Sequence, residues 1–274
     1  MTGALEPVGP PGSENRGRLL IDEPAPGVAR VTISNPGKRG ALDHPILDGI
    51  AAQLPGLGAR CVILTGEGDS FSAGYDISEL GAEVSATEAE RLVAHPFAAA
   101  IEAIASYPFP TVAALNGHAI GGGLELAVAC DLRIAAAGIT LAMPPGKLGL
   151  VYSHTGIARF IEVVGAARTR ELFLAGRRID ARIAHRWALV NEIAPPERVS
   201  AVAVEWATAI AGDAPLAQRG NKRVIDALLE ARARLPAQTE RELIELRRAC
   251  LRSEDFREGV RAFAEKRSPR WQGR

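Results

Sequence analysis

The stretch NGHAIGGGLELA at residues 116–127 decides the fold, because it joins an apolar strand to a helix through three consecutive glycines. The apolar run TVAAL at 111–115 predicts the strand, and residues 124–130 predict a helix that carries Glu125 in its first turn. Glycines let a backbone approach a ligand closely. The first N–H groups of a helix lack internal partners and can donate to a developing negative charge. The stretch therefore predicts an oxyanion-binding turn, with a plain glycine turn as the alternative.

A second segment has the same character of a strand followed by a glycine-containing loop. CVILTG at 61–66 predicts a buried strand, EGDS at 67–70 a turn, and FSAGYDISEL follows at 71–80. Together and in this order, "LTG…FSAGYDISEL" and "NGHAIGGGLELAVACDLRIA" resemble the enoyl-CoA hydratase/isomerase family, also called the crotonase superfamily. The resemblance begins near Val28 and extends to "FREGVRAFAEKRSPRW" close to the C-terminus.

The composition favours a soluble enzyme over a nucleic-acid-binding or membrane protein. Lys and Arg together number 32 and so do Asp and Glu, which leaves no net charge to attract nucleic acid or an anionic membrane. No apolar run approaches the length that crosses a bilayer. The three scattered cysteines predict a reduced, cytoplasmic protein without a disulfide or metal framework: Cys61, Cys130 and Cys250.

The chain divides into three parts. Residues 1–17 are rich in Gly and Pro without apolar periodicity, which predicts a disordered leader. Residues 18–195 alternate strand and helix patterns and predict an α/β core, whereas residues 196–274 are mostly helical. The resemblance implies a crotonase-type spiral of ββα units whose helical C-terminal region packs subunits into a homotrimer or homohexamer.

The pattern of apolar residues places the individual elements. Strands are expected at 28–34, 61–66, 111–116, 131–136 and 139–142. Helices are expected at 87–106, 122–130, 154–164, 167–175, 180–188, 198–212, 215–231, 236–253 and 255–266.

The resemblance implies that two main-chain amides form an oxyanion hole. They belong to Tyr75 and Gly122, and they would hold the thioester oxygen of an acyl-CoA substrate. The Tyr75 side chain would then line the pocket as a space-filling aromatic. No cofactor is expected, because the CoA is part of the substrate.

The resemblance also implies contacts to the acyl-CoA from a loop at 35–42, from the two glycine-rich segments and from the C-terminal helix. As charges in a Gly/Pro loop, Lys38 and Arg39 could equally be solvated surface, and the charged C-terminal helix could be a solvated face. In relatives the C-terminal pair commonly reaches CoA from an adjacent subunit. The expected binding residues are Lys38, Arg39, Ala41, Ala73, Gly74, Asp76, Ile77, Gly121, Pro145, Phe263 and Lys266.

The acid–base residues depart from those of typical hydratases in the family, which carry two glutamates. Glu125 matches the first, with a favourable charge at a helix N-terminus as its alternative role. The second lies in a Pro-Glu-x-x-x-Gly segment, and the chain has PPGKLG at 144–149, so Pro145 takes its place. Hydration needs both water activation and proton delivery, which two placed carboxylates do conveniently.

The segment "LAMPPGKLGLVY", followed by YSHTGI from Tyr152, resembles that of the methylmalonyl-CoA decarboxylases within the family. Those relatives also lack the second glutamate, and their tyrosine at the place of Tyr152 is thought to hold the substrate carboxylate. Loss of CO2 generates the enolate directly, so no base is required. One departure is Tyr75, where the decarboxylases have a histidine. His154 could compensate as a proton donor or carboxylate partner, or it could be a helix cap or surface residue.

The sequence therefore predicts an acyl-CoA enzyme, preferably a lyase that decarboxylates a malonyl-type CoA. The alternative is an enoyl-CoA hydratase or isomerase that uses Glu125 alone, with help from Tyr152 or His154. Two weaker alternatives are a non-catalytic CoA-binding homologue and a serine hydrolase. Ser153 and His154 do not suggest a catalytic triad, because adjacent side chains rarely face one another.

Overall fold

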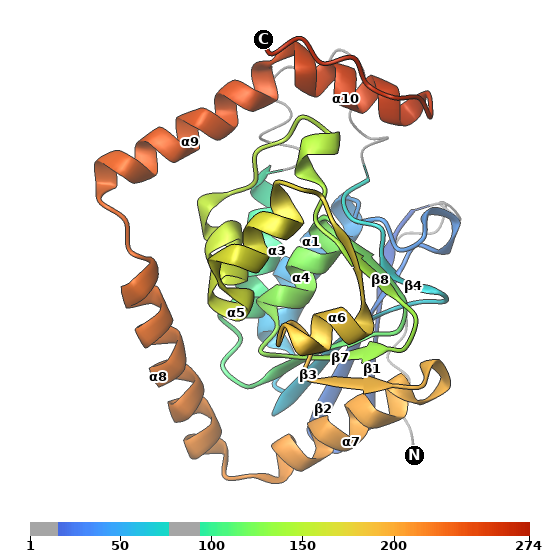
Figure 1. Cartoon of the computed structure of the whole chain (residues 1–274). Coiled ribbons are helices and arrows are strands. Elements are labelled where there is room, and N and C mark those ends of the chain that lie inside the picture. Colours follow the sequence, from blue (N-terminus) through green and yellow to red (C-terminus); the bar gives the residue numbers. More distant parts are fainter. Residues whose placement is uncertain (1–15, 77–93) are drawn as a thin grey trace.

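The protein, described by a computed structural model over residues 16–76 and 94–274, has two β-sheets surrounded by helices (Figure 1). The larger sheet has the strand order β1-β2-β3-β5-β7-β10, and the smaller has the order β4-β6-β8-β9. The strands are β1 Arg18–Ala25, β2 Val28–Ser34, β3 Cys61–Gly66, β4 Ser70–Ser72, β5 Thr111–Leu115, β6 His118–Ile120, β7 Leu132–Ala136, β8 Thr140–Ala142, β9 Arg178–Asp180 and β10 Glu192–Ala194.

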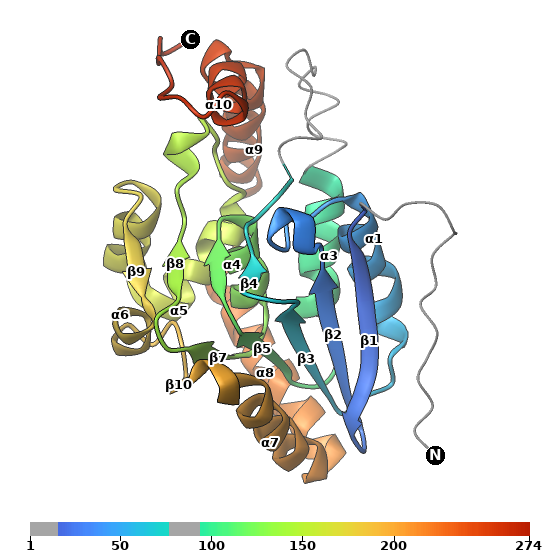
Figure 2. The ribbon, with the colours of Figure 1, turned by 90° about the vertical axis from the view of Figure 1, so that its right-hand side faces the viewer.

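Three successive strand pairs, each followed along the chain by a helix, build the body of the fold. In the pairs β3–β4, β5–β6 and β7–β8, the first strand joins the larger sheet and the second joins the smaller (Figure 2). Strands β2, β3, β5 and β7 pair in parallel, whereas β1 is antiparallel to β2. The repeated ββα units confirm the expected spiral α/β fold.

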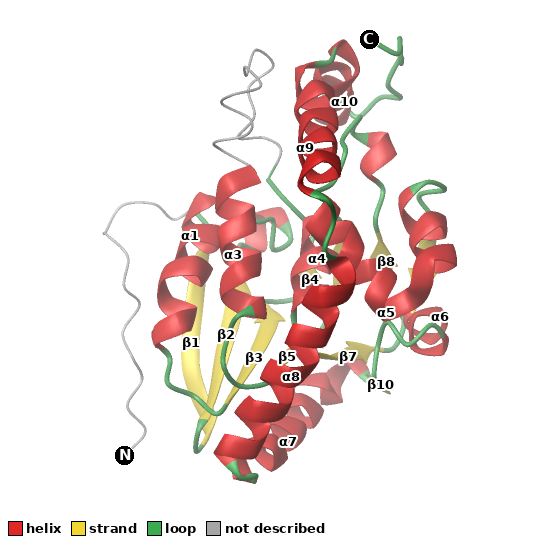
Figure 3. Ribbon diagram, turned by 90° about the vertical axis from the view of Figure 1, so that its left-hand side faces the viewer, coloured by secondary structure: helices red, strands yellow, loops and turns green. Residues whose placement is uncertain are grey.

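Helices cover both faces of the larger sheet, and only helices follow β10 among the described α and β elements. Helix α7 packs on β2, β3, β5 and β7, while α1 and α3 lie side by side (Figure 3). None of the helices within the described ranges has the length and hydropathy needed to cross a bilayer. The helices are α1 His44–Gln53, α3 His95–Ala105, α4 Gly122–Ala129, α5 His154–Phe173, α6 Ala181–Arg186, α7 Val199–Gly212, α8 Pro215–Ala233, α9 Ala237–Arg252 and α10 Glu254–Ala264.

Several elements differ from the sequence prediction. Helix α1 was not predicted, although Asp43 caps it by accepting the Ile46 N–H at 3.2 Å and Pro45 lies in its first turn. The two helices expected at 154–164 and 167–175 are one helix with a kink at Gly165, whose φ is 75°. The structure also contains five strands that the sequence analysis did not predict: β1, β4, β6, β9 and β10. Of the helix expected at 87–106, residues 87–93 lie outside the described residues.

Helix α4 lies at the centre of the molecule, between the sheets and its neighbouring helices (Figure 1). Every residue of α4 is buried, which its small residues GGLELAVA permit because glycine and alanine allow close packing. A fully buried helix has little freedom to tilt or translate. The backbone N–H groups at the N-terminus of α4 are therefore held in fixed positions.

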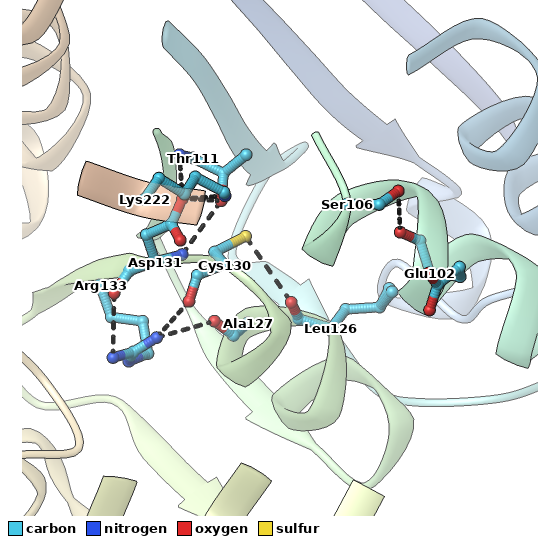
Figure 4. Close-up of polar contacts among 9 residues, drawn as sticks. All are labelled: Glu102, Ser106, Thr111, Leu126, Ala127, Cys130, Asp131, Arg133 and Lys222. Atoms are coloured by element: carbon cyan, nitrogen blue, oxygen red, sulfur yellow. Dashed lines mark hydrogen bonds and ion pairs between the residues drawn. The ribbon is translucent and has the colours of Figure 1, made fainter. Parts of the chain in front are cut away.

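A partly buried ion pair holds helix α8 against this core (Figure 4). Lys222 is only 8% exposed, and its Nζ lies 2.6 Å from Oδ2 of Asp131. The same oxygen accepts the Thr111 N–H at 2.7 Å and the Thr111 hydroxyl at 3.0 Å. Since Thr111 begins β5, the ion pair joins the C-terminal helices directly to the central sheet.

Candidate active site

A cavity of about 560 Å³ lies between the two glycine-rich loops and the C-terminal helices. Its walls come from the loop after β4, the N-terminus of α4, the segment between β8 and α5, one face of α3, and helices α9 and α10. This volume falls in the range that holds a drug-sized ligand. The cavity therefore joins segments separated by more than 150 residues of sequence, from Ala73 to Phe263.

The two predicted oxyanion amides meet at the wall of this cavity. A Cβ added to Gly74 would stand 2.7 Å from the Ile120 carbonyl oxygen and 3.3 Å from the Gly122 nitrogen. A Cβ added to Gly122 would stand 3.5 Å from the Tyr75 nitrogen. A Cβ at Gly74 would collide with the second loop, whereas 3.5 Å is an ordinary contact distance, so the glycine at 74 lets the two loops lie side by side. The role of the amides in catalysis stays a prediction.

Hydrogen bonds on the opposite side of the first loop set the direction of the Tyr75 amide. The Leu42 N–H donates to the Gly74 carbonyl at 2.8 Å, and the Asp76 N–H donates to the Leu42 carbonyl at 2.9 Å. In an extended strand, alternate residues direct their amides to opposite sides. The N–H of Tyr75, between Gly74 and Asp76, therefore points away from Leu42.

Glu125 lies in the first turn of α4 and is 4% exposed. Burial raises the pKa of Glu125 to about 7, while the positive charges of Arg247 and Arg159 oppose the rise. Gly156, near the start of α5, is packed against the Glu125 carboxylate, because a Cβ there would collide with Oε1. A carboxyl group with this pKa can hold or release a proton near neutral pH, as a general acid or base requires.

Tyr152 lies beside the glycine turn, because its hydroxyl oxygen would be 3.3 Å from a Cβ added to Gly121. Its ring packs edge-on against Phe173, with the ring centroids 5.5 Å apart. Burial and the nearby Glu125 carboxylate raise the pKa of Tyr152 well above its ordinary value. The Tyr152 hydroxyl therefore stays protonated and can act as a hydrogen-bond donor to a ligand.

His154 is the first residue of α5 and also lines the cavity. Its Nε2 is 3.6 Å from Oε1 of Glu240, a residue of α9. Ser153 caps the helix, since its Oγ accepts the Gly156 N–H at 3.0 Å and the Thr155 hydroxyl at 3.2 Å. These contacts assign Ser153 a structural role, in agreement with the argument against a catalytic triad.

The predicted substrate-binding residues divide into two groups. One group lines the cavity together with the predicted catalytic and oxyanion residues: Ala73, Gly74, Gly121, Pro145 and Phe263. The other group does not line it: Lys38, Arg39, Ala41, Asp76 and Lys266. Ile77 lies outside the described residues.

The loop that contains Lys38 nevertheless supports the site. Lys38 Nζ is 2.5 Å from Oδ2 of Asp76, and the Ala73 N–H donates to the Arg39 carbonyl at 3.1 Å. Arg39 has a φ of 55° and an exposed side chain. Ala41 is buried, and its carbonyl accepts from the Asn35 amide at 2.8 Å. The loop thus holds the backbone around Gly74 in position.

Comparisons with known proteins identify the family of the chain. The sequence model of the family described as "Enoyl-CoA hydratase/isomerase" matches residues 23–274. The chain belongs to this family. The match confirms the resemblance found in the sequence, and the protein is accordingly an enzyme of the crotonase superfamily that acts on CoA thioesters.

Individual relatives carry several different reaction names. A protein of Thermus thermophilus that carries the name enoyl-CoA hydratase is 36% identical over 259 residues, which cover 89% of this chain and 97% of that protein. A carnitinyl-CoA dehydratase of Citrobacter koseri is 37% identical over 221 residues, or 78% of this chain and 82% of that protein. A solved methylmalonyl-CoA decarboxylase in complex with 2-nitronate-propionyl-CoA has a TM-score of 0.84 at 28% identity and covers 94% and 99% of the two chains.

Sequence reasoning missed two cationic side chains of this crotonase-type site. Arg159 of α5 and Arg247 of α9 both line the cavity, and both affect the pKa of Glu125. On α9, Arg247 is accompanied by apolar lining residues at helical spacing: Leu243, Ile244 and Leu251. That spacing within a charged helix was the available signal for a buried face.

Proposed function

We propose that the protein is a lyase that decarboxylates a malonyl-type acyl-CoA through a thioester enolate, without a cofactor beyond the CoA of its substrate. The observation that carries the proposal is the identity of the acid–base groups around the cavity. Glu125 is the buried carboxyl group among the described lining residues, and Pro145 occupies the place of the second glutamate. Proline cannot activate water, whereas decarboxylation needs no base.

The proposed reaction balances with the groups that line the cavity. The bond between the α-carbon and the substrate carboxylate breaks, CO2 leaves, and its bonding electrons form the thioester enolate. The negative charge collects on the thioester oxygen, where the N–H groups of Tyr75 and Gly122 and the N-terminus of α4 would stabilise it. A proton then adds to the α-carbon and completes the shorter acyl-CoA.

Glu125 is suited to deliver that proton. Because burial raises its pKa to about 7, a large fraction of the carboxyl group is protonated near neutral pH. After it protonates the α-carbon, the resulting carboxylate regains a proton from solvent. The Tyr152 hydroxyl, which stays protonated, would donate a hydrogen bond to the carboxylate of the substrate before CO2 leaves.

A second candidate is hydration or dehydration of an enoyl-CoA, with isomerisation as its variant, all with Glu125 as the only carboxyl catalyst. Two relatives at 36% and 37% identity carry hydratase and dehydratase names, which favours this candidate. The ionised fraction of Glu125 could act as the base. The candidate lacks a second buried carboxyl group among the described lining residues.

Product analysis with two substrates tests the proposal. The protein is incubated with methylmalonyl-CoA and with crotonyl-CoA, and the products are identified by mass spectrometry. We expect loss of CO2 from methylmalonyl-CoA, and turnover of crotonyl-CoA alone would reject the decarboxylase. The Glu125→Gln variant is the matched control, because it should nearly abolish hydration but only slow decarboxylation. Binding of CoA esters without turnover would instead indicate a non-catalytic homologue.

A further inference from the structure

Helices α9 and α10 meet at a tight corner, which one side chain holds from both directions. The Ser253 hydroxyl donates to the Cys250 carbonyl at 2.7 Å and so closes the last turn of α9. The same oxygen accepts the Phe256 N–H at 3.0 Å and caps α10. Because one residue ends the first helix and begins the second, the angle between them has little freedom. We call residues 250–259 the α9–α10 corner.

The backbone of this corner lies directly on the backbone of Leu148 and Gly149. A Cβ added to Gly259 would stand 2.5 Å from the Leu148 carbonyl oxygen, and a Cβ added to Gly149 would stand 3.0 Å from the carbonyl oxygen of Asp255. Gly149 also has a φ of 60°, a conformation that favours glycine. Two glycines that are far apart in sequence therefore allow a main-chain contact that side chains would prevent.

The thiol of Cys250 adds a polar contact to the same segment. Its Sγ lies 2.9 Å from the Gly149 carbonyl oxygen, to which it donates a weak hydrogen bond. Burial raises the pKa of this thiol, and the backbone amide of Val151 opposes the rise, so the sulfur also lies beside Val151. The corner thus contacts the chain at positions 148, 149 and 151, and the last of these directly precedes Tyr152.

Tyr152 depends on such outside support, because residues 150–153 belong to no helix or strand. A segment of this kind has no regular ladder of hydrogen bonds to fix its backbone. On its other side, the Tyr152 ring packs against Phe173, with 5.5 Å between the ring centroids. Tyr152, Phe256 and Val260 all line the cavity, so the corner and the tyrosine face the same space.

We propose that the α9–α10 corner places the Tyr152 hydroxyl in the cavity, so that Cys250 and Gly259 are positioning residues. The inference rests on the proposed function only for its kinetic consequence, in which Tyr152 donates a hydrogen bond to the substrate carboxylate. A displacement of about 1 Å would misplace that hydroxyl, and errors of this size can cost on the order of a hundredfold in rate.

Fluorine NMR measures the position of Tyr152 without any turnover. The chain contains three tyrosines, so incorporation of 3-fluorotyrosine labels three sites, and the variants Tyr75→Phe, Tyr107→Phe and Tyr152→Phe assign their resonances. Gly259→Ala and Cys250→Ala should each shift the Tyr152 resonance, because each removes one of the contacts that hold its backbone. Cys250→Ser keeps a hydrogen-bond donor and should return the resonance toward its wild-type position.

Two controls separate positioning from a general loss of structure. Tyr107 is buried in the hydrophobic core, where its hydroxyl donates to the Ala59 carbonyl at 2.7 Å, and its resonance should stay in place. Gly220→Ala on α8 adds a methyl group in open space and should shift none of the resonances. Since alanine favours a helix more than glycine does, Gly259→Ala does not weaken α10 itself.

A double-mutant cycle tests the kinetic consequence. Gly259→Ala should lower kcat/KM for methylmalonyl-CoA by roughly 10–100-fold in the wild-type protein. In the Tyr152→Phe background the same substitution should lower it by less than about twofold, because the hydroxyl that the corner positions is then absent. A merely structural effect would be equal in both backgrounds and would count against the inference.

Each outcome of the NMR experiment decides the inference. A Tyr152 resonance that is unchanged in both Gly259→Ala and Cys250→Ala overturns it, and so does an equal shift of the Tyr107 resonance. If Gly259→Ala does not fold, the comparison of Cys250→Ala with Cys250→Ser decides. Failure of the wild-type protein to decarboxylate methylmalonyl-CoA is a separate result, which would reject the lyase while the resonances still decide what positions Tyr152.

Discussion

Glu125 couples the protonation state of one buried carboxyl group to the stability of the whole fold. Its pKa is about 7 in the folded protein, above the ordinary value of 4.5. The folded state therefore binds this proton more tightly than the unfolded state. The stabilisation is complete below about pH 4.5 and is lost as pH rises through about 7.

Replacing Glu125 with Gln should remove this pH dependence. Between pH 5 and 8, the free energy of unfolding of the wild-type protein should fall relative to the variant by on the order of 3 kcal/mol. Denaturant titrations at several pH values measure the difference. Parallel pH profiles for the two proteins would mean that Glu125 does not titrate in this range.

The direction of the pH–activity profile should report the chemical role of Glu125. If Glu125 delivers a proton to the enolate, kcat/KM for methylmalonyl-CoA falls as pH rises through about 7, because the acid form disappears. A base in hydration gives the opposite slope with crotonyl-CoA. Initial rates between pH 5.5 and 8.5 distinguish the two. The Glu125→Gln variant should lose the inflection, and an inflection that persists would point to another group.

Gly122 offers a test of the oxyanion pair without a change in charge. In Gly122→Ala the new Cβ would stand 2.9 Å from the Phe97 ring and 3.5 Å from the Tyr75 nitrogen, between the two amides proposed to hold the thioester oxygen. We expect kcat to fall by roughly 10²–10³-fold, as for the loss of an oxyanion donor. Steady-state kinetics measure the change. Gly220→Ala, in open space on α8, is the control and should keep full activity.

At the scale of elements, the Lys222–Asp131 pair should determine how firmly α8 is held. Lys222→Met leaves Asp131 without its cationic partner (Figure 4), and we expect a loss of about 2 kcal/mol in the free energy of unfolding. Chemical denaturation measures it. Arg223→Met is the control, because the Arg223–Glu230 pair is exposed on both sides and should contribute under about 0.5 kcal/mol. Equal losses in both variants would contradict a special role for Lys222.

The elements that the sequence predicted are those with a strong local signal. The apolar runs of β3 and β5 are followed by Gly66 and Gly117, where a Cβ would collide with the backbone, and α4 begins directly after the glycine run, so these three elements were predicted. Strands β4, β6 and β9 were missed; each has only three residues, too few to show a period, although β8, which is equally short, was expected at 139–142. Their pairing depends on distant strands rather than on local sequence.

The part of the candidate site that has a strong local sequence signal was predictable, and the part contributed by distant helices was not. The positions of Glu125, Tyr152 and the two amides followed from segments that lie near the glycine run or resemble the family. Arg247 is 122 residues beyond Glu125 in sequence, and within RELIELRRACLR its charge looks like part of a solvated face. Only the packing of α9 over the cavity reveals its role.

At the scale of the whole molecule, α8 exposes a group of large apolar side chains. Val224, Ile225 and Leu228 are 59%, 57% and 63% exposed, and such clusters mark interaction surfaces. The expectation of a homotrimer or homohexamer predicts that this face packs against another copy. Leu228→Arg should then shift the molecular mass in solution toward the monomer.

Light scattering coupled to size-exclusion chromatography measures that shift. Leu174→Arg is the control, because Leu174 is also apolar and exposed but lies outside α8. An unchanged mass for Leu228→Arg, or an equal shift for Leu174→Arg, would contradict an interface on α8.

Because α9 closes one side of the cavity, the residues that line it come from two segments that lie far apart in the sequence. The amides of Tyr75 and Gly122, which we propose stabilise the enolate, come before residue 123, whereas α9 and α10 contribute cavity-lining residues only after residue 242. We therefore expect changes in this C-terminal segment to alter which thioesters the cavity accepts and to leave the loops around Tyr75 and Gly122 in place. Chimeras that exchange only this segment between relatives should inherit the donor's substrate preference and retain the recipient's chemistry.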